Sequence, residues 1–367
     1  MTTPRETIPW FQLETGEAEG RAVAEVMASG YLNDGAVARQ LERSVADLLG
    51  TPHAVAVTSG TAALALALMA VGVGPGDEVI VPDLTFVATA NAVRLAGAEV
   101  VLVDVDPHRF ALDPERAEAA ITRRTRALLP VDVNGRGADY VALEEIARRH
   151  GLALVSDACE GLGSRWQGKP LGSFGDAGCF SFSANKTVSS GQGGMIALHD
   201  EGRLHRLREL KDQGRRAGGT GGADLHPVMG YNFKYTNLQA AVALAQWDRL
   251  AARLDLFRQR EQWYREFLGE VPGVCLPPWD EAGGEIPQWT DILVEDRAKV
   301  EAALAAQGMG SRGFWLPLHR QAPYRRPDDD FGGALEVSRK GLWLPSSFSL
   351  TREQARRVAE VVRTAVA

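Results

Sequence analysis

Short apolar runs alternate with runs of helical spacing from His53 to Leu198, and no other feature of the sequence constrains the fold as strongly. The apolar runs predict strands at Ala54–Val57, Glu78–Pro82, Val100–Val105, Ala127–Val131, Leu152–Val155 and Met195–Leu198. The runs between them predict helices at Ala62–Val71, Thr85–Leu95, Pro114–Ile121 and Tyr140–His150. This alternation predicts a three-layer α/β/α fold, with a mostly parallel sheet covered by helices on both faces.

The segments on either side of this region predict an arm and a second domain. Residues 1–50 suit an extended arm followed by helices, and residues 201–230 suit a helix followed by a mobile Gly-rich loop. Composition shifts at about residue 250, so we expect a large domain over residues 1–250 and a smaller C-terminal α+β domain over 251–367. Further helices are predicted at Glu17–Met27, Ala36–Leu49, Thr236–Phe267, Val300–Ala306 and Arg352–Val366.

Charge and cysteine content narrow the function classes. The net charge is −7 and no basic run is present, which argues against nucleic acid and anionic membranes as partners. The three cysteines, Cys159, Cys179 and Cys275, form no CxxC or CxxH pair, so neither a disulfide framework nor a metal site is expected. The first residues have no apolar signal core and no run is long enough to span a bilayer. We therefore expect a cytoplasmic protein.

A lysine follows a predicted strand in the stretch from Gly178 to Gly194. Phe180 and Phe182 alternate as in a strand, Lys186 comes next, and a Ser/Gly-rich loop follows. Ligands of α/β proteins bind at strand ends. A partly desolvated lysine there can lose its proton and form a Schiff base with an aldehyde. An ordinary surface lysine fits this stretch equally well.

Two other strand ends carry polar groups. Ser59, Gly60 and Thr61 lie between a strand and a helix, where backbone N–H groups suit a phosphate, although a plain helix cap explains them too. Asp157 closes a very apolar strand and needs a partner, which a protonated pyridine nitrogen, a loop N–H or an arginine would supply. Phe86 at a further strand end suits either a flat ring or the core.

Together these features meet the needs of one cofactor, pyridoxal phosphate (PLP). The cofactor requires a phosphate cradle, a ring-stacking side chain, a carboxylate for the ring nitrogen and a lysine, which the sequence supplies in order. The set predicts a PLP enzyme more specifically than any member does alone.

The same residues resemble the DegT-type sugar aminotransferases, a branch of the fold-type I PLP enzymes, over essentially the whole chain. The motifs that carry the resemblance are Ser29-Gly-Tyr-Leu, Ser59-Gly-Thr-Ala-Ala-Leu, Gly72-Val-Gly-Pro-Gly-Asp, Thr85-Phe-Val-Ala-Thr-Ala-Asn, Asp104-Val-Asp-Pro, Ser156-Asp-Ala-Cys-Glu, Ser183-Ala-Asn-Lys, Gly230-Tyr-Asn-Phe-Lys-Tyr-Thr-Asn and Pro317-Leu-His-Arg-Gln-Ala-Pro-Tyr. The forms around Glu160 and Lys186 look most like nucleotide-sugar 4-aminotransferases of the GDP-perosamine synthase type.

The resemblance implies a role for each site residue. Lys186 would be catalytic, Asp157 would pair with the ring nitrogen, and Glu160 would lie near the ring hydroxyl. Ser181 would bind the phosphate with Gly60 and Thr61. Asn232 would reach the cofactor of a neighbouring subunit, so a homodimer is implied. The side chains implied at the nucleotide-sugar substrate are Tyr31, Arg312 and His319.

Three departures from the family pattern concern the substrate rather than the cofactor. Gln192 replaces a glutamate after the lysine, Asp132-Val-Asn-Gly135 replaces His-Leu-Tyr-Gly, and Lys234 replaces an arginine. We expect transfer of an amino group from glutamate or glutamine to a 4-keto-6-deoxy sugar nucleotide. A 3-keto sugar nucleotide or a cyclitol ketone remains an alternative acceptor, and a non-catalytic sugar-nucleotide sensor is a further one.

Two other enzyme classes fit the sequence less well. A sugar dehydratase of the same family would carry histidine at the position of Lys186. A dinucleotide-binding dehydrogenase would carry GxGxxG after the first strand, and this motif is missing there.

Overall fold

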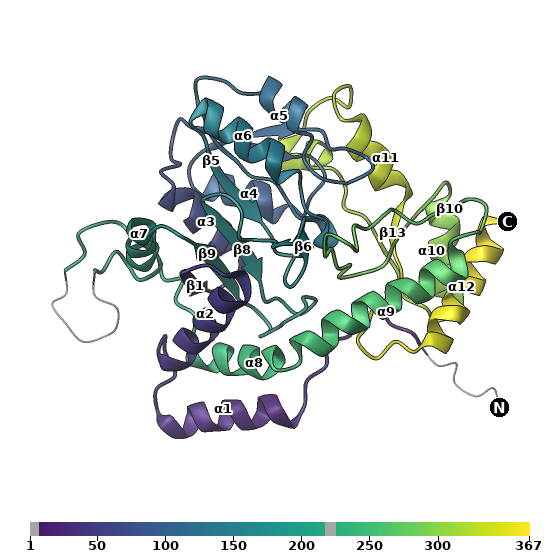
Figure 1. Cartoon of the computed structure of the whole chain (residues 1–367), viewed down its shortest axis with the longest axis horizontal. Coiled ribbons are helices and arrows are strands. Elements are labelled where there is room, and N and C mark those ends of the chain that lie inside the picture. The colour runs from purple at the N-terminus through teal and green to yellow at the C-terminus, as the bar shows by residue number, and fades with distance from the viewer. Residues whose placement is uncertain (1–6, 217–224) are drawn as a thin grey trace.

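A seven-stranded sheet forms the centre of the molecule in the computed structural model, which describes residues 7–216 and 225–367 (Figure 1). Its strands lie in the order β1-β9-β8-β5-β4-β2-β3. Their bounds are β1 His53–Val57, β2 Glu78–Pro82, β3 Glu99–Val103, β4 Thr125–Leu128, β5 Ala153–Asp157, β8 Ala177–Ser181 and β9 Gly194–Leu198. Only β9 runs against the other six, so the predicted, mostly parallel sheet is confirmed.

Alternating side chains of the strands pack into helical layers on opposite faces. Val79 and Val81 of β2 enter the core formed with α3, α4 and α7, whereas Ile80 enters the core under α5 and α6. Helices α2 and α8 cover the second face beside β1 and β9. These layers are built from α2 Ala36–Leu49, α3 Gly60–Ala70, α4 Ala88–Leu95, α5 Pro114–Ala119, α6 Tyr140–His150, α7 Glu201–Lys211 and α8 Asn237–Trp247.

Local sequence explains where several of these helices begin and end. Ser59 caps α3, because its side chain accepts a hydrogen bond from the Ala62 N–H. The helix predicted from Thr236 begins with a capping box and breaks at Asp248 and Arg249, so α8 and α9 (Leu250–Leu268) are separate. The loop predicted at Ala217–Gly222 lies outside the described residues.

A four-stranded antiparallel sheet organises the C-terminal part of the chain. Its strands lie in the order β10-β11-β13-β12, and α10 and α12 pack with α9 into one core. Ile8 of the N-terminal arm forms a bridge to Met309 and joins this core. The elements here are β10 Val274–Cys275, β11 Asp291–Val294, α10 Arg297–Ala306, β12 Arg312–Gly313, α11 Gly332–Lys340, β13 Gly341–Trp343 and α12 Arg352–Val366. The predicted domain boundary near residue 250 coincides with the start of α9 and stays a prediction.

Shorter elements complete the fold. Helix α1 (Glu17–Ser29) packs along α8 at the lower edge of Figure 1. A two-stranded sheet joins β6 (Arg165–Trp166) to β7 (Lys169–Pro170). Three single 3-10 turns are η1 Val133–Gly135, η2 Leu318–Arg320 and η3 Ala322–Tyr324. None of the described helices is both long and apolar enough to cross a membrane.

Candidate active site

A pocket of about 280 Å³ opens at the carboxyl ends of the parallel strands. This is the edge at which α/β sheets bind ligands, because loops from several strands converge there. The antiparallel β9 contributes the loop before its first residue. The lining side chains are those of Ser59, Gly60, Thr61, Leu64, Thr85, Phe86, Ala88, Thr89, Val131, Asp157, Cys159, Glu160, Ser181, Ser183, Asn185, Lys186, Gln192, Arg312 and Trp315.

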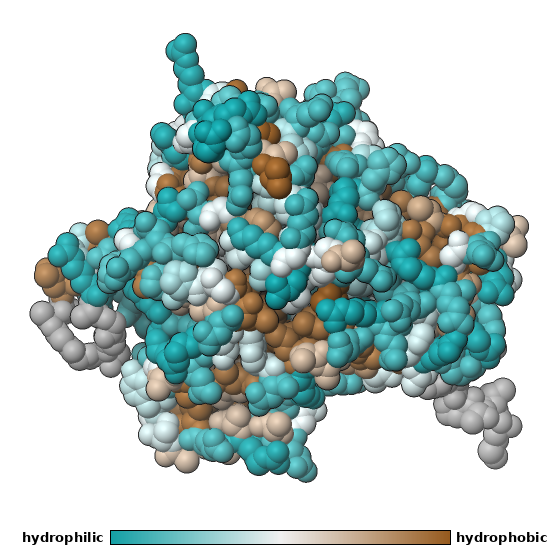
Figure 2. Space-filling view, in the orientation of Figure 1, coloured by the Kyte–Doolittle hydropathy of each residue, from teal (hydrophilic) through white to brown (hydrophobic). Residues whose placement is uncertain are grey.

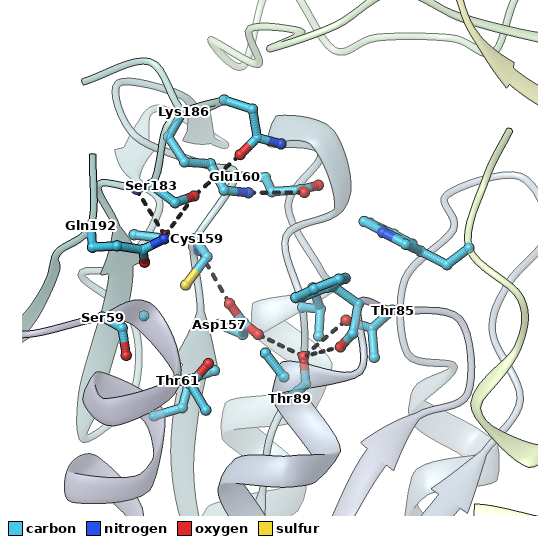
Figure 3. Close-up of a pocket in the computed structure, with 18 of the residues that line it drawn as sticks. Ser59, Thr61, Thr85, Thr89, Asp157, Cys159, Glu160, Ser183, Lys186 and Gln192 are labelled. Atoms are coloured by element: carbon cyan, nitrogen blue, oxygen red, sulfur yellow. Dashed lines mark hydrogen bonds and ion pairs between the residues drawn. The ribbon is translucent and has the colours of Figure 1, made fainter. Parts of the chain in front are cut away.

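Asp157 is the last residue of β5 and lies at the floor of this pocket (Figure 3). The Thr89 hydroxyl donates to its Oδ2 at 2.8 Å, and the Cys159 N–H donates to its Oδ1 at 3.2 Å. Burial raises the pKa of the Asp157 carboxyl, and these hydrogen bonds oppose that effect. No cation of the described chain is in ion-pair contact with Asp157, so the carboxylate can accept a cationic N–H from a ligand.

Lys186 lies on the loop between β8 and β9, and its amine faces Glu160. The Nζ atom is 3.1 Å from Glu160 Oε1 and 5.3 Å from the centre of the Trp289 ring. The Asn134 N–H donates to Glu160 Oε2 at 3.0 Å and thereby fixes the carboxylate. The lysine side chain is 12% exposed, which leaves the amine accessible from the pocket.

The start of α3 forms a cradle on another side of the pocket. Gly60 lies so close to the facing residues that an added Cβ would be 2.9 Å from Cys159 Sγ and 3.0 Å from Ser181 Cβ. The hydroxyls of Ser59, Thr61 and Ser181 surround this glycine, and the helix N-terminus carries unpaired N–H groups. A phosphate is the ligand that such a cradle suits.

Phe86 supplies an aromatic wall. Its side chain is 52% exposed although it is large and apolar, and it lines the pocket just before α4. It is therefore not a core residue of this chain, and its ring is free to stack on a flat ligand.

These residues fit PLP. Asp157 is a buried carboxylate without a cation, Gly60 keeps the cradle open, Phe86 offers a ring face, and Lys186 supplies an accessible amine. The structure thus brings most of the expected cofactor residues to one pocket, and Asn232 is the exception. Among the residues that the structure describes, no cluster of His, Cys, Asp and Glu suited to a metal ion is found.

Three of the residues predicted at the substrate or cofactor do not line this pocket. Tyr31 is 46% exposed on the loop before α2, and Asn232 is exposed beside Asp212, with which it forms a bridge. His319 is fully buried: its Nδ1 lies 2.6 Å from Asp83 Oδ2, and its Nε2 lies 3.0 Å from Asp328 Oδ1. Its ring also stacks on Phe331, so it is enclosed rather than open to the pocket. Arg312, by contrast, lines the pocket as expected of a substrate residue.

The structure adds pocket residues that sequence reasoning missed. Thr89 supports Asp157, and its hydroxyl is 2.9 Å from that of Thr85. Both threonines stand in the Thr85-Phe-Val-Ala-Thr motif, so their spacing was the available signal. Asn185 stands in the Ser183-Ala-Asn-Lys motif, whereas Trp315 carried no such signal, because a lone residue in a loop follows no period.

The departures from the family pattern fall in different surroundings. Gln192 lines the pocket, whereas Lys234 forms an ion pair with Asp212 at 2.6 Å. Asp132 is enclosed, with the Tyr140 hydroxyl donating to Oδ1 at 2.7 Å, and burial raises its pKa to about 7. Only the first of these departures can contact a ligand of the pocket directly.

The fold and this pocket together define a PLP-dependent transferase of fold type I. The model of the DegT/DnrJ/EryC1/StrS aminotransferase family matches residues 14–363. The chain therefore belongs to this family and is a PLP-dependent aminotransferase.

Curated relatives and a solved structure resemble the chain along nearly its whole length. GDP-perosamine synthase of Caulobacter vibrioides is 37% identical, covering 97% of this chain and 96% of the relative. A UDP-N-acetyl-3-dehydro-alpha-D-glucosamine 3-aminotransferase of Acidithiobacillus ferrooxidans is 38% identical, covering 89% of this chain and 87% of the relative. The crystal structure of S. venezuelae DesV with a ketimine intermediate has a TM-score of 0.93 and 34% identity, covering 99% and 98% of the two chains.

Proposed function

We propose that the protein transfers an amino group from glutamate or glutamine to a nucleotide-linked 4-keto-6-deoxy sugar. The observation that carries the proposal is the accessible Lys186 amine facing the same pocket as the buried Asp157 and the Gly60 cradle. The reaction has two halves. The donor would give up its amine and depart as a 2-oxo acid, and the keto sugar would then take that amine and depart as an amino sugar.

The chain's own residues bind the cofactor and move protons in this scheme. When bound, PLP supplies an electron sink that stabilises negative charge on the carbon next to the transferred nitrogen. Asp157 would accept the ring N–H, Phe86 would cover the ring, and Glu160 would lie by the ring oxygen. The Lys186 amine would act as the base and acid that takes up and returns a proton in each half-reaction. Ser59, Gly60, Thr61 and Ser181 would hold the phosphate.

The relatives support a sugar nucleotide as the acceptor but differ in the carbon aminated. One relative is named for a GDP-linked product and the other for a 3-aminotransferase that acts on a UDP-linked sugar. The GDP-linked 4-keto sugar is our first candidate because that relative matches more of this chain. A 3-keto sugar nucleotide is the second candidate, and a cyclitol ketone the third.

We further propose that the active unit is a homodimer. Asn232 and Tyr31 are exposed and lie outside their own chain's pocket, so a second subunit is what would bring them to one. Large apolar side chains are exposed at Met27, Tyr31, Leu32 and Phe86. Figure 2 shows hydrophobic residues gathered on one face in the lower centre of the view, as is common where a partner binds. His319 lies outside this interface: held between Asp83 and Asp328, it would position the loop that follows it in the chain.

The location that we propose is the cytoplasm. Cys159, Cys179 and Cys275 are all free thiols in the structure, which suits a reducing compartment.

A pair of half-reactions tests the proposed substrates. The PLP-loaded protein is mixed with glutamate or glutamine, the donor is removed, and candidate keto sugars are added one at a time. We expect the cofactor absorbance to change with the donor and to return with a GDP-linked 4-keto-6-deoxy sugar. If the cofactor absorbance returns only with a UDP-linked 3-keto sugar, the substrate is our second candidate. No change with either donor would contradict the proposal.

Mixed dimers test the shared pocket. Lys186→Ala and Asn232→Ala each impair both sites of their own homodimer, but a heterodimer of the two keeps one pocket with both residues intact. The two variant homodimers should be inactive or weak. Their heterodimer should have at most about half of the wild-type activity. No recovery on mixing would contradict the role of Asn232 across subunits.

A further inference from the structure

Arg312 is the one arginine among the residues that line the pocket. It stands on β12, which pairs with β13 so that Arg312 lies opposite Trp343. Arg312 belongs to the C-terminal sheet, whereas most of the other pocket residues lie at strand ends of the large sheet. It therefore places a permanent positive charge in the pocket. The pocket's two carboxylates, Asp157 and Glu160, bond to Thr89, Cys159, Lys186 and Asn134, and neither pairs with Arg312.

Aromatic rings hold the Arg312 guanidinium, and no acidic group does. Its central carbon lies 5.1 Å from the Trp10 ring centre and 5.4 Å from the Trp343 ring centre. Within residues 7–216 and 225–367 no hydrogen bond or ion pair to its side chain is formed. Stacking on rings fixes the plane of a guanidinium and leaves its N–H groups free for a planar anion.

The same aromatic layer links Arg312 to Lys186. The Lys186 amine lies 5.3 Å from the Trp289 ring centre, and that ring lies 5.3 Å from Trp10 and 5.1 Å from Trp343. The two cations thus flank one layer of indole rings. Both cations line the same pocket, so a small molecule whose amine reacts at Lys186 shares that pocket with Arg312.

We propose that Arg312 binds a carboxylate of the amino donor during the first half-reaction; this inference rests on the aminotransferase function proposed above. An amino-acid donor brings at least one carboxylate into a pocket that holds a cofactor phosphate and two acidic side chains. Arg312 is the cation that offsets this charge, and its fork matches a carboxylate. The diphosphate of a sugar nucleotide is a poorer match, because a whole sugar ring separates it from the reacting carbon.

Three donors measured on wild type and Arg312→Gln test the proposal. Glutamate has both carboxylates, glutamine lacks the side-chain one, and the α-amide of glutamate lacks the other. The PLP-loaded proteins are titrated with each donor, and the single-turnover absorbance change is followed. We expect the half-saturating glutamate concentration to rise roughly 10- to 100-fold in the variant. A donor that lacks the bound carboxylate should be weak with wild type and no weaker with the variant.

The pattern over the three donors identifies the carboxylate. If Arg312→Gln weakens binding of glutamate and glutamine but not of the α-amide, Arg312 binds the α-carboxylate. If it weakens binding of glutamate and the α-amide but not of glutamine, Arg312 binds the side-chain carboxylate. An equal loss with all three donors would overturn the proposal, because it would mean a structural role. A loss confined to the keto-sugar half-reaction would overturn it in favour of the diphosphate.

Controls separate binding from folding and from cofactor loss. Arg312→Lys keeps a point charge without the fork, so its half-saturating glutamate concentration should lie between those of wild type and Arg312→Gln. Arg123 is an exposed arginine just before β4, at the opposite end of the sheet, and Arg123→Gln should match wild type. Cofactor content, read from absorbance, should be unchanged by Arg312→Gln, and loss of cofactor would overturn the proposal. Failure of wild type itself with every donor would contradict the proposed function instead.

Discussion

Lys186 and Lys211 both face carboxylates, and only Lys186 is placed for chemistry. The Lys211 amine, at the end of α7, lies 2.8 Å from Asp34 Oδ2, 2.9 Å from the Ala56 carbonyl oxygen and 3.8 Å from Glu42 Oε1. Lys186 has Glu160 as its single close oxygen partner among the described residues, at 3.1 Å. An ammonium has three donors: Lys211 has two oxygens within hydrogen-bond distance and a third charged one nearby, whereas Lys186 has one.

The surroundings of the two lysines explain this difference. The Lys211 side chain is 2% exposed and ties α7 to β1 and to the loop before α2. Burial lowers its pKa, and the nearby Glu42 and Asp34 oppose that effect. Lys186 stands on a loop at the strand ends, beside a pocket. A buried amine with all its partners stabilises the fold, whereas an accessible amine with spare donors can react.

The largest effect is expected for Lys186→Ala. Turnover should fall by roughly 10²–10⁴-fold or more, because the proton-carrying amine is removed. The thermal unfolding temperature should change little, since the side chain anchors no element. Activity with the best keto sugar and a melting curve check both parts. Wild-type turnover in this variant would refute the role of Lys186.

Lys211→Ala should show the reverse pattern. Removal of one member of a buried charge network costs roughly 3–5 kcal/mol of unfolding free energy. The cost should lie at the lower end, because Arg39 and Arg208 also contact Glu42. Denaturant unfolding measures it, with Lys211→Met as a control that keeps the apolar stem. A loss well below 1 kcal/mol would show that the network is not what holds α7.

Asp157 and Asp132 differ in the same way as the two lysines. Asp157 faces the pocket, whereas Asp132 is enclosed by Tyr140 and Ser156. Burial raises the pKa of Asp132 to about 7 from an ordinary 3.8, so the folded protein binds this proton more tightly than the unfolded chain. Its contribution to stability is present below pH 3.8 and is lost as the pH rises through about 7. Wild type should therefore lose up to about 4 kcal/mol relative to Asp132→Asn over this range.

Denaturant unfolding of both cofactor-free proteins at a series of pH values checks this expectation. The difference between them isolates Asp132, because the other titrating groups are common to both. A difference independent of pH would contradict the account, because it would mean that folding does not shift the pKa of Asp132.

A smaller effect is expected from Thr89→Val, which removes one hydrogen-bond donor to Asp157 and keeps the side-chain shape. The loss of a bond to a charged group is worth about 1.5 kcal/mol, so PLP should bind roughly tenfold more weakly. Thr85→Val is the matched control, because Thr85 contacts Thr89 and makes no direct contact with Asp157. Equal effects of the two variants would indicate that the threonine pair, and not the bond to Asp157, matters.

Periodic segments of the fold were predictable from the sequence, and short or irregular ones were not. The bounds of Ala36–Leu49, Glu78–Pro82, Tyr140–His150 and Arg352–Val366 agree with the structure residue for residue. The helix predicted from Thr85 begins three residues later, at Ala88, since Thr85 and Phe86 line the pocket. A C-terminal α+β domain was expected but its strands were not placed, because strands such as Val274–Cys275 are too short to show a period.

For the site, the sequence predicted residues that line the pocket at strand ends and missed features that depend on burial. Asp157 and Ser59 follow apolar runs, so their place at one edge of the sheet follows from the parallel strands. Nothing in the sequence distinguishes the enclosed His319 from an open one, since both of its carboxylate neighbours come from loops. The wall of Trp10, Trp289 and Trp343 likewise joins segments far apart in the chain.

The most direct test of the account is to ask which lysine binds the cofactor. PLP is added to the cofactor-free protein, the covalent link is reduced with borohydride, and the digested protein is sequenced by mass spectrometry. The account predicts the label on the peptide that contains Lys186 and none on that containing Lys211. A label on Lys211, or no stable label under saturating PLP, would contradict it.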